Sequence, residues 1–168
     1  MTAASAISRQ LDDIAAIVMS IGASTYAARP MAEVSGSIGE HVRHCLDHIS
    51  ALVGATTSKP LSYDRRERGT AIERDPAEAL RLIMRLRALV ERWGERSMDE
   101  PLCVASMLTA SGDSVIGWST LGRELAFVNS HTIHHQAMIA VLLSLAGLAV
   151  PDRLGFAPAT PTKRSGAV

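Results

Sequence analysis

Every histidine of the chain, six in all, belongs to one of two short clusters. They are His41, His44 and His48 in the first cluster and His131, His134 and His135 in the second. Imidazole is the commonest protein ligand of transition metals. Two histidines four residues apart on a helix project from one face and can bind a single ion. His44 and His48 have this spacing, and so do His131 and His135, which indicates a metal site between two helices.

The ligand set is only partly determined by spacing. Three protein ligands plus one open position are typical of a catalytic metal site. His131 and His135 are expected to supply two of the ligands. The third ligand would come from the first cluster, where His44 is preferred and His48 and His41 remain alternatives.

Other polar residues near the clusters allow two interpretations each. Glu124 lies seven residues before His131, on the same helix face, and could orient a ligand or act as a base. It could equally pair with nearby arginines. Cys45 could be a soft ligand, although a helix cysteine beside an apolar stripe is usually a core residue. His134 points away from its neighbours and is expected to face solvent or support a ligand.

Both clusters lie in segments with helical periodicity. Residues 37–53 are predicted to form one helix, with Ser35 or Ser37 as its N-cap and Gly54 at its end. Residues 121–148 are predicted to form the other. The two histidine clusters are therefore expected to face each other from two long helices.

The remaining segments complete an all-α fold. Apolar stripes predict further helices over residues 4–22 and 76–93, and a polar connection at 55–75 joins the helix at 37–53 to the one at 76–93. Residues 101–118 suggest a short β-hairpin. Together these elements predict a four-helix bundle with a small β-hairpin excursion before the last helix.

Length and composition fit one domain. The chain has 168 residues, of which 47% are hydrophobic. We expect a single domain over residues 1–161, followed by a disordered tail at residues 162–168. The most apolar run, residues 137–150, is too short to cross a bilayer, so no membrane partner is expected.

The charge balance excludes other classes of partner. The chain has 17 basic and 17 acidic residues, a net charge of zero, which argues against a nucleic-acid surface and against a polybasic membrane anchor. Two cysteines provide no disulfide framework and are typical of a reducing cytoplasm. We therefore expect a cytoplasmic protein that acts on a small molecule.

Three segments of the chain resemble the DinB-like superfamily. They are S-I-G-E-H-V-R-H-C-L-D-H, Y-D-R-R-E-R and G-R-E-L-A-F-V-N-S-H-T-I-H-H-Q-A-M-I-A. The resemblance implies an up-down-down-up four-helix bundle with a metal held by three histidines. These would be His131 and His135 of the last helix together with one residue of the second helix, namely His44, with His48 and His41 as alternatives.

The same resemblance implies an activity. The superfamily resembles thiol-dependent transferases and isomerases that use bacillithiol or mycothiol, in which the metal would activate the cofactor thiol. We therefore expect a Zn²⁺ or Ni²⁺ ion, a low-molecular-weight thiol, a homodimer, and either thiol-transfer or hydrolase chemistry. The alternative is a non-enzymatic metal-binding or stress-response protein with a structural or vestigial site.

Overall fold

The computed structural model describes residues 2–30, 35–64, 67–93 and 96–161. Within these ranges the chain is mostly helical, with one two-stranded antiparallel hairpin. The long helices are α1 (Ala3–Ser20), α3 (Ile38–Val53), α4 (Pro76–Glu91) and α5 (Leu121–Leu145). The prediction of a mostly helical chain with a small hairpin before the last helix is confirmed.

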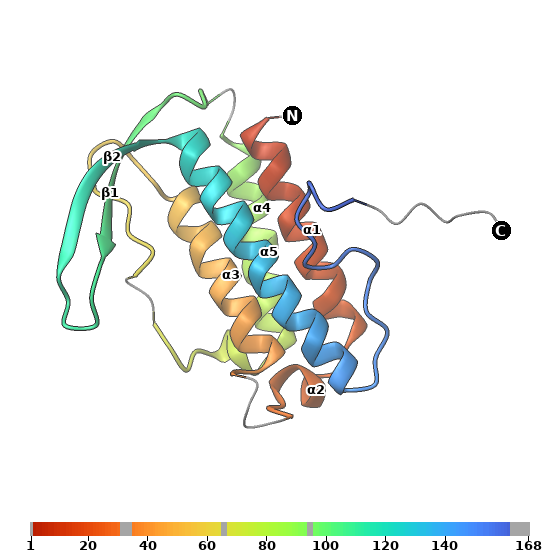
Figure 1. Cartoon of the computed structure of the whole chain (residues 1–168). Coiled ribbons are helices and arrows are strands. Elements are labelled where there is room, and N and C mark those ends of the chain that lie inside the picture. Colours follow the sequence, from red (N-terminus) through yellow and green to blue (C-terminus); the bar gives the residue numbers. More distant parts are fainter. Residues whose placement is uncertain (1, 31–34, 65–66, 94–95, 162–168) are drawn as a thin grey trace.

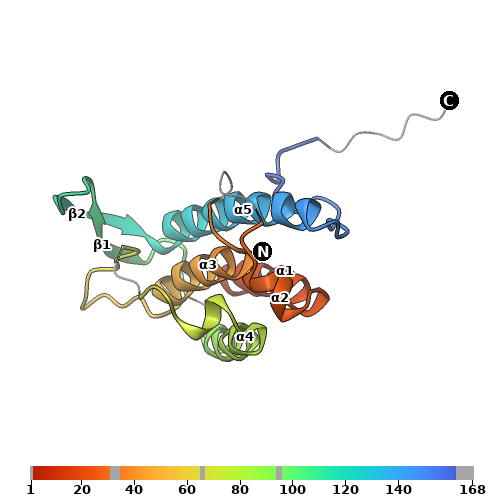
Figure 2. The ribbon, with the colours of Figure 1, turned by 90° about the horizontal axis from the view of Figure 1, so that it is seen from below.

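The four long helices lie side by side (Figure 1). Helices α3 and α1 each contact both α4 and α5. Seen from below, α5 and α4 lie on opposite sides of α1 and α3 (Figure 2). The colours of Figure 1 show that α1 and α5 run in one direction and that α3 and α4 run in the other.

A continuous apolar core joins the helices. Helix α1 buries Ile7, Leu11 and Ile14, whose spacing of three and four residues places them on one face. Helix α3 contributes a similar stripe that includes Leu46 and Ile49. Because these stripes face the bundle interior, they fix the rotation of each helix about its own axis.

Side-chain caps set the start of both histidine-bearing helices. Ser37 accepts a hydrogen bond from the backbone N of Glu40, while the Glu40 carboxylate accepts one from the backbone N of Ser37 at 2.7 Å. Thr120 accepts a hydrogen bond from the backbone N of Arg123 at 3.2 Å. Such caps satisfy backbone donors that have no partner inside the helix. The caps therefore position the first turn of α3 and of α5.

The region after α1 differs from the sequence prediction. A short helix, α2 (Ala23–Ala27), forms in a segment for which the sequence predicted no helix. Its Tyr26 is fully buried and donates a hydrogen bond to the carbonyl of Ile72 at 2.8 Å, next to the short 3₁₀ helix η1 (Ala71–Glu73). Five residues give too weak a periodic signal for prediction, and the burial of one tyrosine stabilises the segment.

The end of the last helix also differs from its prediction. Helix α5 ends at Leu145 and not at residue 148. Gly147 follows with a positive φ of 70°, a conformation that glycine adopts without steric cost.

The hairpin consists of β1 (Pro101–Met107) and β2 (Ser114–Thr120). Strand β2 ends at the N-cap of α5, so the hairpin leads directly into the helix that carries the second histidine cluster. No helix of the described residues has both the length and the apolar character needed to cross a membrane.

Gly39 allows α3 to pack closely on η1, and we expect Gly39→Ala to destabilise the protein. A Cβ atom there would lie 2.1 Å from the carbonyl oxygen of Glu73 and 2.6 Å from a ring carbon of Tyr26. The backbone must shift, at a cost of about 2 kcal/mol in the free energy of unfolding. Urea denaturation measures this loss. Gly22→Ala is the matched control, because a Cβ atom there has no neighbour within 4 Å, and equal midpoints for the two variants would contradict the packing argument.

Candidate metal centre

Imidazole rings from α3 and α5 meet where the two helices pack together. The Nε2 atoms of His44 and His131 lie 2.7 Å apart, and the Nδ1 atoms of His41 and His135 lie 2.9 Å apart. A neutral imidazole has one donor nitrogen and one acceptor nitrogen. Each of these short contacts therefore requires either a proton on one of the two nitrogens or a cation between them.

Three of the histidines form a group that could hold a metal ion. One ring nitrogen each of His44, His48 and His131 lies within 4.8 Å of the others. His48 was an alternative ligand in the sequence analysis, and it is buried. His135 lies beside this group, with its ring centroid 4.3 Å from that of His44 and 4.7 Å from that of His131. The predicted set of His44, His131 and His135 stays a prediction.

Backbone carbonyls orient two of the rings. Nδ1 of His48 donates to the carbonyl of His44 at 3.0 Å, so the lone pair of the neutral ring is on Nε2. Nε2 of His41 donates to the carbonyl of Ser35, also at 3.0 Å. Metal-bound histidines almost always donate their second ring nitrogen to such a partner. His48 and His41 therefore have the orientation that ligands require.

Tyr63 forms a wall of the site. Its ring stacks on His48, with centroids 5.2 Å apart and planes 5° from parallel. Its hydroxyl donates to Glu124 at 3.0 Å, and the Ser119 hydroxyl donates to the other carboxylate oxygen at 2.6 Å. Glu124 is buried and is connected to His48 through Tyr63. The sequence-based alternative for Glu124 was pairing with nearby arginines, and two of the loop arginines, Arg65 and Arg66, lie outside the described residues.

Burial keeps two of the imidazoles neutral. It is the main cause that lowers the pKa of His135 to about 3, and the neighbouring imidazoles lower this pKa further. Burial also lowers the pKa of His41. Neutral rings retain the lone pair that a metal needs. By contrast, burial raises the pKa of the Cys45 thiol to about 12, and this fully buried residue belongs to the apolar core.

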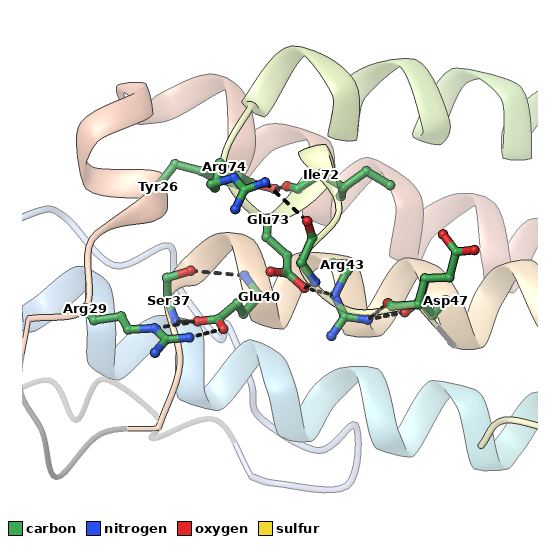
Figure 3. A network of polar contacts seen from close by, with 11 residues as sticks. Tyr26, Arg29, Ser37, Glu40, Arg43, Asp47, Ile72, Glu73 and Arg74 are labelled. Atoms are coloured by element: carbon green, nitrogen blue, oxygen red, sulfur yellow. Dashed lines mark hydrogen bonds and ion pairs between the residues drawn. The ribbon is translucent and has the colours of Figure 1, made fainter. Parts of the chain in front are cut away.

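The opposite face of α3 is held by a polar network (Figure 3). Arg43 is buried, with its Nε 2.7 Å from a carboxylate oxygen of Glu73 and a further ion pair to Asp47. It also donates to the carbonyl of Glu67 at 3.0 Å. Removing one partner of a buried ion pair is strongly destabilising. The network thus fixes η1 and the preceding connection to α3, behind the histidine cluster.

A cavity of about 790 Å³ opens on a neighbouring face of α3. Its lining includes Asp47, Ala51, Leu61, Ser62 and Ile116, so α3, the connection after it and the hairpin all contribute. The lining contains none of the histidines. It does contain Asp47, which pairs with Arg43 on the face of α3 opposite the histidines, so the cavity opens beside the polar network and not beside the imidazole rings.

Acid should destabilise the metal-free protein through His135. Its pKa is about 3 when folded and 6.5 when unfolded, so between these values the unfolded state binds more protons. This stabilising contribution is complete above pH 6.5 and is lost progressively as the pH falls towards 3. We expect His135→Gln to show a weaker decline in unfolding free energy over this range, measured by urea titrations with a chelator.

The control for this experiment is His134→Gln, which removes an exposed histidine from the adjacent position of α5. A decline in His135→Gln as steep as in the wild type would contradict the assignment.

Comparison with known proteins identifies the family. Residues 6–139 match the family model of the DinB superfamily. FK506-binding protein 5 of Rhizopus delemar is 35% identical over 101 residues, which are 60% of this chain. The match spans 26% of the length of that fungal protein. No solved structure matches the chain. With four long helices, a small hairpin and a matching family model over most of its length, the chain belongs to the DinB superfamily.

Proposed function

We propose that the protein is a metal-dependent enzyme with a divalent ion held between α3 and α5 by three histidines. The observation that carries this proposal is the group of His44, His48 and His131. Membership of the DinB superfamily agrees with it. Zn²⁺ and Ni²⁺ are the proposed ions, because imidazole ligands suit several late first-row metals. The four long helices would form the up-down-down-up bundle expected from the sequence.

The donor set fits such an ion. On a tetrahedral Zn²⁺, ligand nitrogens at about 2.0 to 2.1 Å from the metal lie about 3.4 Å apart. The Nε2 atoms of His44 and His131 are 2.7 Å apart, which is shorter than this ligand spacing. The ligand atoms of the whole group lie within 4.8 Å of one another, a limit longer than this spacing. Small side-chain rotations would suffice to reach ligand spacing. We propose His48 as the third ligand, with His135 as the alternative that the family resemblance implies.

A divalent ion at this position would supply a positive charge that favours the deprotonated form of a thiol or of water. The protein's own residues would orient the ligands of this ion. Tyr63, fixed by Glu124, would hold the ring of His48 in place. Glu124 would thus be a positioning residue, not a base. The half-buried positions of His44 and His131 leave them partly accessible to a small molecule.

The proposed reaction is the transfer of a low-molecular-weight thiol. The thiol sulfur would form a bond to an electrophilic carbon of the substrate, while the leaving group departs with its bonding electrons and the thiol proton passes to solvent. Hydrolysis, with water as the nucleophile, is the second candidate, because the same ion could activate either nucleophile.

We propose a cytoplasmic location, which agrees with the two free thiols, Cys45 and Cys103. The fungal relative is named for binding FK506, but the match covers 26% of that protein, so this ligand is not proposed here.

Metal content tests the site. Protein purified without a metal-affinity tag should contain about one ion per chain. We expect His44→Ala, His131→Ala and His48→Ala to lose it, because each removes one of three ligands. Elemental analysis measures the ratio of metal to protein. His135→Ala distinguishes the two ligand sets: loss of metal in this variant, and not in His48→Ala, would favour the family-like set.

His134→Ala is the matched control for the metal measurement, since it removes an exposed histidine from the same helix. The metal proposal fails if the purified wild type contains no metal and takes up neither Zn²⁺ nor Ni²⁺ on titration.

Thiol consumption tests the chemistry. The metal-loaded protein, given a low-molecular-weight thiol and an alkylating electrophile, should accelerate the loss of free thiol. We expect His44→Ala to abolish this acceleration and His134→Ala to retain it. Colorimetric thiol titration gives the rate. A fully metal-loaded protein that accelerates neither thiol loss nor ester hydrolysis would instead indicate a structural metal site, the non-enzymatic alternative.

A further inference from the structure

The hairpin has one strand edge that no other described segment covers. Strand β1 pairs with β2 on one side, and on its other side it is bridged by Leu61. The backbone N of Leu61 donates to the carbonyl of Cys103, and its carbonyl accepts from the N of Ala105, at 2.8 Å each. Figure 1 shows β2 on the far side of β1 from the helices. Its outer edge therefore faces away from the bundle.

The register of the hairpin identifies the backbone groups at this edge. Cys103 pairs with Trp118, and Ala105 pairs with Ile116. Because Cys103 and Ala105 direct their backbone groups towards Leu61, their partners must direct their N–H and C=O groups away from β1. Trp118 and Ile116 thus present unpaired donors and acceptors at the free edge of β2.

The side chains of this strand also differ from those of a protected edge. Ile116 is 65% exposed and Trp118 is 78% exposed. The sequence of β2, S-V-I-G-W-S-T, contains no charged residue and no proline. Natural edge strands usually carry such residues, which prevent pairing with another chain. An apolar, uncharged edge strand is therefore suited to pairing.

We propose that β2 pairs antiparallel with β2 of a second copy of this chain, about a two-fold axis at Gly117. This register pairs all seven residues of the strand. It places Ile116 opposite Trp118 of the second copy, so the two exposed apolar side chains cover each other. Both residues direct their backbone groups outward, so they form hydrogen-bonded pairs. The homodimer that the family resemblance implies would thus form through the hairpin.

Gly117 is consistent with this axis. A Cβ atom at Gly117 would have no neighbour within 4 Å, and its φ is not positive, so the folded chain itself does not require a glycine there. At the axis, the two Gly117 residues would form a non-hydrogen-bonded pair with Cα atoms about 4.5 Å apart. Glycine inside a strand often marks the close approach of another backbone.

Charges at the two ends of β2 are complementary in the same arrangement. Exposed Asp113 directly precedes the strand, and exposed Arg123 follows it by three residues. Antiparallel pairing brings the acidic end of each strand next to the basic end of the other. A parallel arrangement would place like charges together. These charges therefore favour β2 of a second copy as the strand that pairs with this edge.

The oligomeric state of the full chain tests the proposal. Sedimentation velocity over a concentration series should show a dimer for the wild type. Ile116→Lys adds a charge at the paired face, and Ile116→Pro removes an outward N–H without removing a donor from the β1–β2 ladder. Both variants should sediment as monomers. Val115→Lys is the matched control, since it adds the same charge on the opposite face, and it should remain dimeric.

Circular dichroism first establishes that each variant retains the wild-type helix content. A wild type that is monomeric at every concentration overturns the proposal and leaves the edge to another partner, such as an extended peptide. A dimer retained by Ile116→Pro also overturns it, whatever Ile116→Lys does, because the interface would then lie elsewhere, for example on the helix faces.

Discussion

Helices α3 and α5 meet along a seam where imidazole nitrogens face each other at 2.7 and 2.9 Å. These distances are short enough that a proton or a cation must lie between each pair. The relative position of the two helices therefore determines whether the nitrogens can share a proton or bind a cation. Helix caps fix where α3 and α5 begin, and Arg43 holds the outer face of α3. A shift of one helix along the other by a single residue would separate every histidine pair.

Burial of imidazoles is costly unless they are hydrogen-bonded or bound to a metal. The chain satisfies two of them with backbone carbonyls, at His41 and His48, and it directs Nδ1 of His41 at Nδ1 of His135 and Nε2 of His44 at Nε2 of His131. Such a site is compatible with folding in the absence of metal, yet it would gain stability from an ion that binds only the folded state. Metal binding and folding are therefore expected to be coupled without either being obligatory for the other.

The sequence indicated that histidines of two helices face each other, but not which of them are closest or which other residues surround them. Periodicity and caps predicted the long helices well, because their apolar stripes extend over several turns. The choice among His41, His44 and His48 could not be made, since these residues lie within a narrow sector of one helix and the packing rotation decides which ring meets His131. Tyr63 could not be placed because its loop has no periodic pattern. Helix α2 depends on one buried tyrosine, a tertiary contact that local sequence does not encode.

The hairpin and the candidate metal centre are connected by consecutive contacts. Ser119, in β2, donates to Glu124, which also accepts from Tyr63, and Tyr63 stacks on His48. The strand that carries the free edge is thus two hydrogen bonds and one ring contact away from a proposed ligand. Since β2 also continues directly into α5, ordering of β2 by a partner strand would restrain both the start of α5 and the wall of the site. Pairing at the edge could therefore affect metal affinity without any residue of the second copy entering the site.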